Sequence, residues 1–177
     1  FSDARMLGLM FETEPEISLR LLPPPLEPAD SPGGMMFIAD YPRTNLGPGY
    51  KEAAIYLTCK YQGEQGSYCL SMPITREERM HNGRDVFGLP KKLADIYLER
   101  DGPRAAGWVK RKDVKFVEIS ARLTGSIPAL PPMGPTFLLK AMPRIDLSPG
   151  FDGPVLLCRQ RTDIEMKTCE VGEAEVS

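Results

Sequence analysis

The stretch Gly83-Arg84-Asp85-Val86-Phe87-Gly88-Leu89-Pro90-Lys91-Lys92-Leu93-Ala94 places two adjacent lysines directly behind a proline. Apolar or small residues lie on both sides of the pair, whereas an exposed basic patch would have polar neighbours. Lysine is almost never fully buried without a partner, so a lysine pair among residues that favour burial is chemically unusual. One use for such a site is a lysine kept neutral and nucleophilic near pH 7. The rest of the chain would then provide the cavity around it.

Keeping a lysine neutral near pH 7 requires a large change in its pKa. A free lysine has a pKa of ~10.4, so a value of ~6–7 requires roughly 5 kcal/mol of differential interaction. A like charge ~4 Å away at an effective dielectric of ~20 supplies ~4 kcal/mol, and full burial can lower a lysine pKa by a comparable amount. Adjacent side chains of an extended segment point to opposite faces, which favours burial as the cause and leaves Lys92 as a structural ion-pair partner.

Composition and charge indicate an ordinary globular domain. The chain has 177 residues, of which 42% are hydrophobic and 26% charged, which is enough for one domain with a buried core. A net charge of -2 gives no electrostatic case for nucleic acid or an anionic membrane. No apolar run approaches the ~20 residues that a membrane span needs. We therefore expect neither nucleic acid nor a membrane as a partner.

The cysteines and the single histidine do not show a metal-binding pattern. These residues are Cys59, Cys69, Cys158, Cys169 and His81. Free, partly buried thiols in a reducing compartment are expected, which predicts a cytoplasmic location and no metal or other cofactor. A cross-strand pairing of Cys59 with Cys69 is the alternative, because the two flank a hairpin turn. His81 follows a polar helical run and is interpreted as a surface residue.

Proline and glycine indicate the fold class. The 18 Pro and 16 Gly residues are spread through apolar segments, which is typical of many short elements joined by turns. Strands are expected at residues 5–11, 33–39, 53–61, 67–74, 94–99, 107–112, 114–123, 136–142, 155–158 and 162–171. The pattern predicts a mainly β fold, a mostly antiparallel sheet or barrel with a few short helices, in a single domain over residues 1–177.

The expected helices and loops punctuate these strands. One helix is expected from Glu14 to Leu22. A second begins at Thr75, the N-cap of a capping box with Glu78, and ends with Gly83 as its C-cap. Residues 41–49 and 126–135, both rich in proline and glycine, are expected to be loops.

The run from Gly83 to Ala94 closely resembles the signature of the acetoacetate decarboxylase family, Gly-Arg-Glu followed a few residues later by Pro-Lys-Lys-Leu. Upstream, Gly49-Tyr50-Lys51-Glu52-Ala53-Ala54 resembles the family segment that carries a site glutamate, at a matching spacing. The segments at residues 135–143 and 154–159 resemble the later strands of the family, so the resemblance covers almost the whole chain. It implies a cone-like β-barrel, a homo-oligomer, and closing C-terminal strands that lie beyond residue 177.

The resemblance also implies roles for individual residues. Lys91 corresponds to the lysine that forms a Schiff base with the keto acid, and Lys92 to the neighbour credited with lowering its pKa. Glu52 matches a site carboxylate that would orient the substrate or shuttle a proton. Across a one-residue gap, Arg5 matches a site arginine that would pair with the substrate carboxylate. Tyr50 is interpreted as a substrate-binding residue of the cavity wall, with a place in the core as the alternative.

One departure from the family pattern concerns the reaction. Another family glutamate, on the strand before residue 41, is replaced by Phe37 or a neighbour. The first hypothesis is a lyase that acts on a small 2- or 3-oxo acid, by decarboxylation of a β-keto acid such as acetoacetate through a lysine imine. The second is an aldolase-dehydratase of secondary metabolism that uses the same scaffold without decarboxylation. The third, of another class, is a non-catalytic barrel that binds a small hydrophobic ligand.

Overall fold

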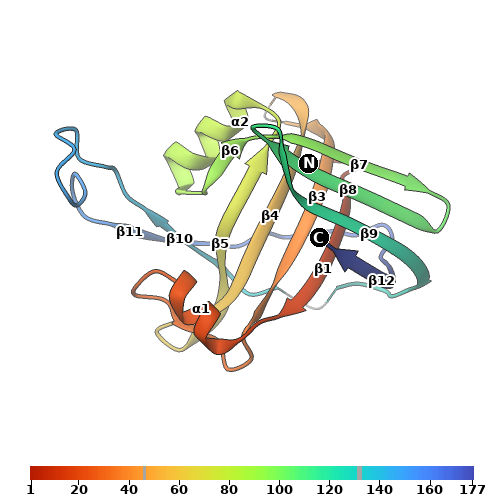
Figure 1. The fold of residues 1–177 in the computed structure, drawn as a ribbon, viewed down its shortest axis with the longest axis horizontal. Coiled ribbons are helices and arrows are strands. Elements are labelled where there is room, and N and C mark those ends of the chain that lie inside the picture. Colours follow the sequence, from red (N-terminus) through yellow and green to blue (C-terminus); the bar gives the residue numbers. More distant parts are fainter. Residues whose placement is uncertain (46, 131–132) are drawn as a thin grey trace.

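The computed structural model describes residues 1–45, 47–130 and 133–177, so residues 46 and 131–132 of the two expected loops lie outside the described residues. Most of the described chain is β-strand (Figure 1). The elements in order are β1 (Arg5–Glu12), α1 (Pro15–Leu21), β2 (Glu27–Pro28), β3 (Gly33–Thr44), β4 (Gly47–Tyr61), β5 (Glu64–Ile74), α2 (Glu77–His81), the π-helical turn η1 (Asn82–Val86), β6 (Lys91–Leu93), β7 (Asp95–Asp101), β8 (Arg104–Arg111), β9 (Val114–Ser126), β10 (Thr136–Lys140), β11 (Leu156–Gln160) and β12 (Glu170–Val176). The predicted mainly β class with a few short helices is confirmed.

The described strands pair into two sheets. The first has the order β1-β3-β4-β5-β10-β11, with β2 added to β4 and β6 added to β5, and the second has the order β12-β9-β8-β7. Most pairs are antiparallel, as expected, but β5 pairs in parallel with both β6 and β10. Closure of these strands into a barrel stays a prediction.

The central strands of the first sheet, β3, β4 and β5, carry buried residues on both faces. On one face, Leu7 and Ile38 pack against Val109 and Ile119 of the second sheet, which crosses in front of the first in Figure 1. Ile38, Val109 and Ile119 have no measurable exposure, and burying each such side chain contributes ~1.5–3 kcal/mol. The opposite face carries a separate apolar cluster that includes Phe37, Ala54, Cys69, Met72 and Leu138. The first sheet therefore separates an inter-sheet core from a second buried layer.

Several strand predictions are wrong at their boundaries, most clearly at the hairpin of β3 and β4 and at the last strand. The expected loop at residues 41–49 is the end of a long hairpin, because β3 continues to Thr44 and β4 begins at Gly47. Gly49 allows a close strand approach there, since a Cβ on it would lie 2.5 Å from the carbonyl oxygen of Pro42. The last strand runs over Glu170–Val176 instead of residues 162–171. Every residue of β12 is exposed, so its sequence carries no burial pattern, and its position is set by pairing with β9.

The predicted capping of the second helix is also wrong. Arg76 occupies the N-cap of α2 without a side-chain bond, because Thr75 Oγ1 instead accepts a hydrogen bond of 3.0 Å from the backbone N–H of Lys51. Gly83 does not end the helix but lies inside η1. α2 and β6 lie at one end of the first sheet and α1 at the other (Figure 1). Among the described helices, none is long and apolar enough to cross a membrane.

Candidate active site

The backbone of Lys91 is held at the end of the first sheet. After η1, Gly88 turns the chain with a φ of +79°, a conformation that glycine adopts without strain. β6 then pairs in parallel with the end of β5, which places Lys91 beside Met72. Lys91 is thereby fixed by sheet pairing, which is a more rigid support than a free loop.

The side chain of Lys91 enters the protein past Gly83. Lys91 is only 6% exposed. A Cβ on Gly83 would lie 2.5 Å from Cδ of Lys91 and closer still to Cε, so only glycine leaves room for the lysine stem. Gly83 belongs to the π-helical turn η1, and such turns occur frequently at functional sites. The glycine of the sequence signature is therefore needed for packing against the lysine, and its predicted role as a helix cap is wrong.

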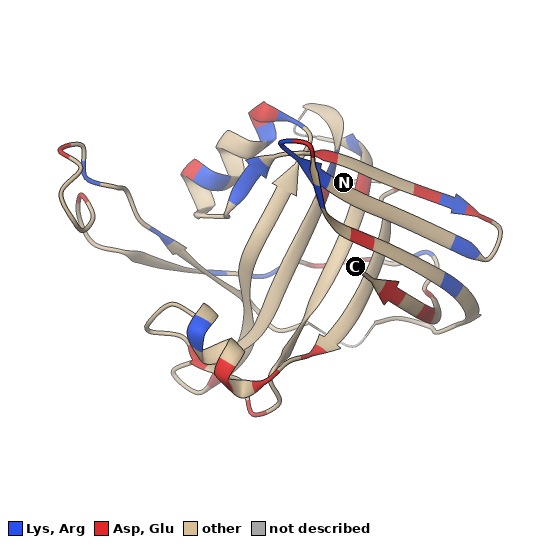
Figure 2. Ribbon diagram, in the orientation of Figure 1, with Lys and Arg blue, Asp and Glu red and all other residues tan. Residues whose placement is uncertain are grey.

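Glu52 meets Lys91 inside the protein. It lies on β4, opposite Ala39 of β3 and Ile74 of β5, and Lys91 Nζ donates a hydrogen bond to its carboxylate. Among the described residues, these two are the only buried charged ones. Figure 2 shows how few charged residues lie along the middle of β3, β4 and β5. A buried ion pair is weak evidence for a stabilising role, so this pair in an apolar layer is a functional-site candidate.

The environment of Glu52 favours its neutral form. Burial raises the pKa of the Glu52 carboxyl above 4.5, and the charge and hydrogen bond of Lys91 oppose that effect. The carboxylate is consequently a stronger base than a solvated glutamate. A buried acid-base pair of this kind can pass one proton between a carboxyl and an amine, which is what imine formation requires.

Tyrosine side chains form one wall beside the pair. The Tyr50 ring lies 5.9 Å from Lys91 Nζ, and Tyr41 packs on Tyr50 with ring centroids 5.2 Å apart. Burial, and secondarily the charge of Glu52, raises the pKa of both phenols. Both hydroxyls therefore stay protonated at neutral pH and can donate hydrogen bonds. Tyr50 is brought to the site as the sequence predicts, whereas Tyr41 falls in the wrongly expected loop and was missed.

Lys92 is not brought to the buried pair. Its side chain is exposed, as is that of Leu93 beyond it. Adjacent residues of β6 point to opposite faces, so Lys91 enters the protein and Lys92 leaves it. Within the described chain, Lys92 forms no salt bridge. Its predicted influence on Lys91, and the alternative of a structural ion pair, both stay predictions.

Arg5 lies on the other face of the sheet from Glu52. The register pairs Arg5 with Asp40 and Asp40 with Lys51, while Ala39 pairs with Glu52. Directly paired residues share a face and their chain neighbours take the opposite one. The Arg5 side chain is 70% exposed and forms a salt bridge of 2.8 Å with Asp40. Its predicted contact with a substrate carboxylate stays a prediction that this placement does not support.

The remaining sequence candidates have structural roles. Arg84 and Asp85, in the turn before Lys91, form an ion pair at 3.1 Å. His81 is exposed and lies 3.5 Å from Glu77, as predicted for a surface residue. All four cysteines are free, so Cys59 and Cys69 are not paired. The described residues contain no group of three or more histidine, cysteine or acidic side chains arranged to hold a metal ion.

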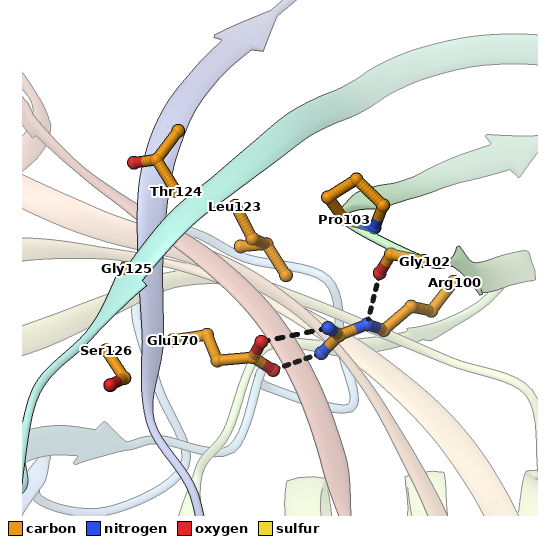
Figure 3. Close-up of a pocket in the computed structure, with 8 residues that line it drawn as sticks. All are labelled: Arg100, Gly102, Pro103, Leu123, Thr124, Gly125, Ser126 and Glu170. Carbon is orange, nitrogen blue, oxygen red and sulfur yellow. Dashed lines mark hydrogen bonds and ion pairs between the residues drawn. The ribbon is translucent and has the colours of Figure 1, made fainter.

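A separate hollow of about 360 Å³ lies on the second sheet, near the turn between β7 and β8. Figure 3 shows Arg100 and Glu170 facing each other across it. The two side chains form a bidentate ion pair, so the charges that could bind a ligand already satisfy each other. The hollow also lacks a lysine, cysteine or histidine in its lining. The hollow therefore offers no nucleophile of these kinds, and Lys91 stays the candidate for the chemistry.

Comparisons with known proteins agree with this geometry. The family model described as acetoacetate decarboxylase matches residues 1–177. Acetoacetate decarboxylases from Burkholderia ambifaria and Burkholderia multivorans are each 27% identical over 194 residues, covering 99% of this chain and 72% of the relative.

Solved structures show the same fold. Acetoacetate decarboxylase from Legionella pneumophila superposes with a TM-score of 0.81 at 23% identity, over 97% of this chain and 70% of that one. An acetoacetate decarboxylase-like enzyme from Sphingomonas wittichii gives a TM-score of 0.84 at 23% identity, over 98% and 76%. The enduracididine biosynthesis enzyme MppR gives 0.82 at 18% identity, over 98% and 72%. The chain therefore belongs to the acetoacetate decarboxylase family and is an enzyme of the acetoacetate decarboxylase-like lyase type.

Proposed function

We propose that this enzyme forms a Schiff base between Lys91 and a small 2- or 3-oxo acid, and that it decarboxylates a β-keto acid such as acetoacetate. The observation that carries the proposal is the buried contact between Lys91 and Glu52. It places an amine next to a carboxylate base in one buried site, and an adjacent general base is one way in which a nucleophile is activated.

Imine formation uses both groups of the pair. Glu52 accepts a proton from the ammonium group of Lys91, and the neutral amine attacks the carbonyl carbon of the oxo acid. Glu52 then returns the proton to the hydroxyl of the carbinolamine, which leaves as water and forms the protonated imine. Because burial raises the pKa of Glu52, its carboxylate is a stronger base than a solvated glutamate, which favours its role in accepting the proton.

The imine then accepts the electrons of the bond that breaks. In a 3-oxo acid, the bond between the α-carbon and the carboxylate cleaves, CO2 leaves, and the electron pair moves to the imine nitrogen to give an enamine. Protonation of the enamine carbon and hydrolysis by water release the ketone and regenerate the amine. In this proposal the protonated hydroxyls of Tyr50 and Tyr41 donate hydrogen bonds to the substrate.

A second reaction on the same imine is supported by Phe37. This residue is paired with Ala54, on the face of the sheet that carries Glu52, and it stacks on Tyr56 at a centroid distance of 6.1 Å. An apolar wall thus stands where the resemblance expects another glutamate. The MppR structure described as complexed with pyruvate suggests an oxo acid whose imine would instead be deprotonated, as in an aldolase-dehydratase.

Borohydride trapping separates these possibilities. The protein is incubated with acetoacetate or with pyruvate, reduced with borohydride, and the adduct is located by mass spectrometry. We expect an adduct on Lys91 that is absent from Lys91→Ala, and CO2 release from acetoacetate. No adduct at Lys91 with either acid would leave only the non-catalytic, ligand-binding alternative, whereas an adduct without CO2 release would favour the aldolase-dehydratase.

The cytoplasmic location, the homo-oligomer and the single domain over residues 1–177 stay predictions. Cell fractionation tests the first of them, and light scattering after size-exclusion chromatography tests the second. A single cooperative unfolding transition is expected for one domain, and two separate transitions would contradict it.

A further inference from the structure

Arg79 lies on the helical face that covers Lys91. It precedes Gly83 by four residues in the continuous helical segment formed by α2 and η1. Residues four apart lie on the same face of a helix, about 6 Å from each other along its axis. Since Gly83 packs directly on the stem of Lys91, Arg79 lies about one helical turn from the nucleophile and on the same side.

The guanidinium group of Arg79 reaches the beginning of β4. A Cβ on Gly47 would lie 2.6 Å from Arg79 Nη2, so the group packs against the backbone of this glycine. Tyr50 follows three residues later on the same strand. The positive charge of Arg79 lowers the pKa of Tyr50, against the larger effects of burial and of Glu52. The guanidinium is therefore within electrostatic reach of the hydroxyl of the tyrosine whose ring faces Lys91.

Arg79 is set apart from the other arginines of this chain. It is the only arginine in the described ranges that is not exposed to solvent. Within those ranges it forms no salt bridge. Exposed arginines such as Arg76 also lack one there, so what distinguishes Arg79 is partial burial without an acidic partner. A half-buried guanidinium with no carboxylate partner, next to a buried nucleophile, has the charge and the planar donor geometry to bind the carboxylate of a ligand.

We propose that Arg79 binds the carboxylate of the oxo acid while Lys91 attacks its carbonyl carbon. This inference rests on the proposed Schiff-base function. It makes Arg79 the residue that selects an oxo acid over a neutral ketone. It also replaces Arg5 in that role, because Arg5 lies on the opposite face of the sheet and is already paired with Asp40.

The test compares a charged and an uncharged carbonyl compound in the same trapping reaction. The rate of borohydride-trapped adduct formation at Lys91 is measured with pyruvate and with acetone. In Arg79→Met, we expect the pyruvate rate to fall ~10–100-fold, the effect of losing a charge-assisted hydrogen bond, and the acetone rate to stay within ~2-fold. Arg76→Met is the matched control, because Arg76 is an exposed arginine at the N-cap of the same helix, and neither rate should change.

The outcomes separate the two proposals. An unchanged pyruvate rate, or an equal fall for pyruvate and acetone, would overturn the role of Arg79 while leaving the Schiff base intact. Trapping of neither compound by the unaltered protein would overturn the proposed function itself. If Arg79→Met does not fold, as judged by circular dichroism, the same comparison is made with Arg79→Lys, which keeps the charge but loses the planar fork. The pyruvate rate of this variant should fall by a larger factor than its acetone rate. A decrease by the same factor for both compounds would again refute the assignment.

Discussion

Replacing Gly83 by alanine tests whether the position of the Lys91 side chain depends on the missing side chain of the glycine. The backbone of Gly83 is helical within η1, so alanine fits the local conformation. Alanine is in fact ~1 kcal/mol more favourable than glycine inside a helix. The only obstacle is the stem of Lys91, 2.5 Å from the new methyl group at Cδ and closer at Cε.

The expected loss of activity follows from these distances. An ordinary van der Waals contact begins at 3.4 Å, so the lysine stem must move by about 1 Å, a displacement that can reduce a rate by ~10²-fold. The same movement withdraws Nζ from Glu52. Glu52 can respond by binding a proton, since burial already raises its pKa. We therefore expect the free energy of unfolding to change by only ~1 kcal/mol, the gain in helix propensity offsetting part of the clash.

The assay measures trapping at Lys91 with acetoacetate and, in parallel, urea unfolding. Asn82→Ala is the control, because Asn82 is an exposed residue of the same turn and its replacement should leave trapping unchanged. A folded Gly83→Ala protein that traps acetoacetate at the original rate would refute the reasoning. A large loss of stability together with the loss of trapping would show that Gly83 matters for folding and not for lysine placement.

Three further predictions concern ionisable groups at and around the site. Burial raises the pKa of Glu52 above 4.5, so the trapping rate should increase with pH as Glu52 loses its proton, at pH values above 4.5. Glu52→Gln should abolish this pH dependence and lower the rate by ~10²–10⁴-fold. An unaltered pH profile in this variant would contradict a role of Glu52 as a base. Lys92 is exposed, so Lys92→Ala should trap acetoacetate with the same pH dependence, and a displaced profile would show that its charge acts on the site. Burial raises the pKa of Cys59 and of Cys69 to about 12, so iodoacetamide at pH 8 should label neither thiol in the folded protein and both after unfolding.

Short-range sequence patterns located the central hairpin, although β4 begins at Gly47 and β5 at Glu64, earlier than the expected residues 53 and 67. Gln62 and Gly63 both adopt positive φ angles, of 51° and 81°, so a tight two-residue turn joins the two strands. The meeting of Lys91 and Glu52 is different, since 39 residues separate them. No local rule brings them together, and their pairing was expected only from the family resemblance.

The errors have physical causes that a single sequence does not reveal. Arg5, whose role stays a prediction, was aligned with a site arginine across a one-residue gap, and in a strand a shift of one residue moves a side chain to the opposite face. Gly83 has the residue type and the position expected of a helix cap. Its actual role depends on the stem of Lys91, which follows eight residues later in the sequence and packs against it. Tyr41 was assigned to a loop because of the nearby prolines and glycines, although it pairs with Tyr50 across the hairpin.

The two buried faces of the first sheet separate the residues of the inter-sheet core from the residues around the candidate site at Glu52. Leu7, Ile38 and Ala53 pack on the second sheet, while the side chains alternating with them, such as Phe37 and Ala54, belong to the layer around Glu52. A substitution in that layer can reshape the substrate site while the inter-sheet core stays intact. Natural variation or mutant libraries can therefore change which oxo acids fit on one face of the sheet, while the pairing of β6 with β5 still holds Lys91 in place.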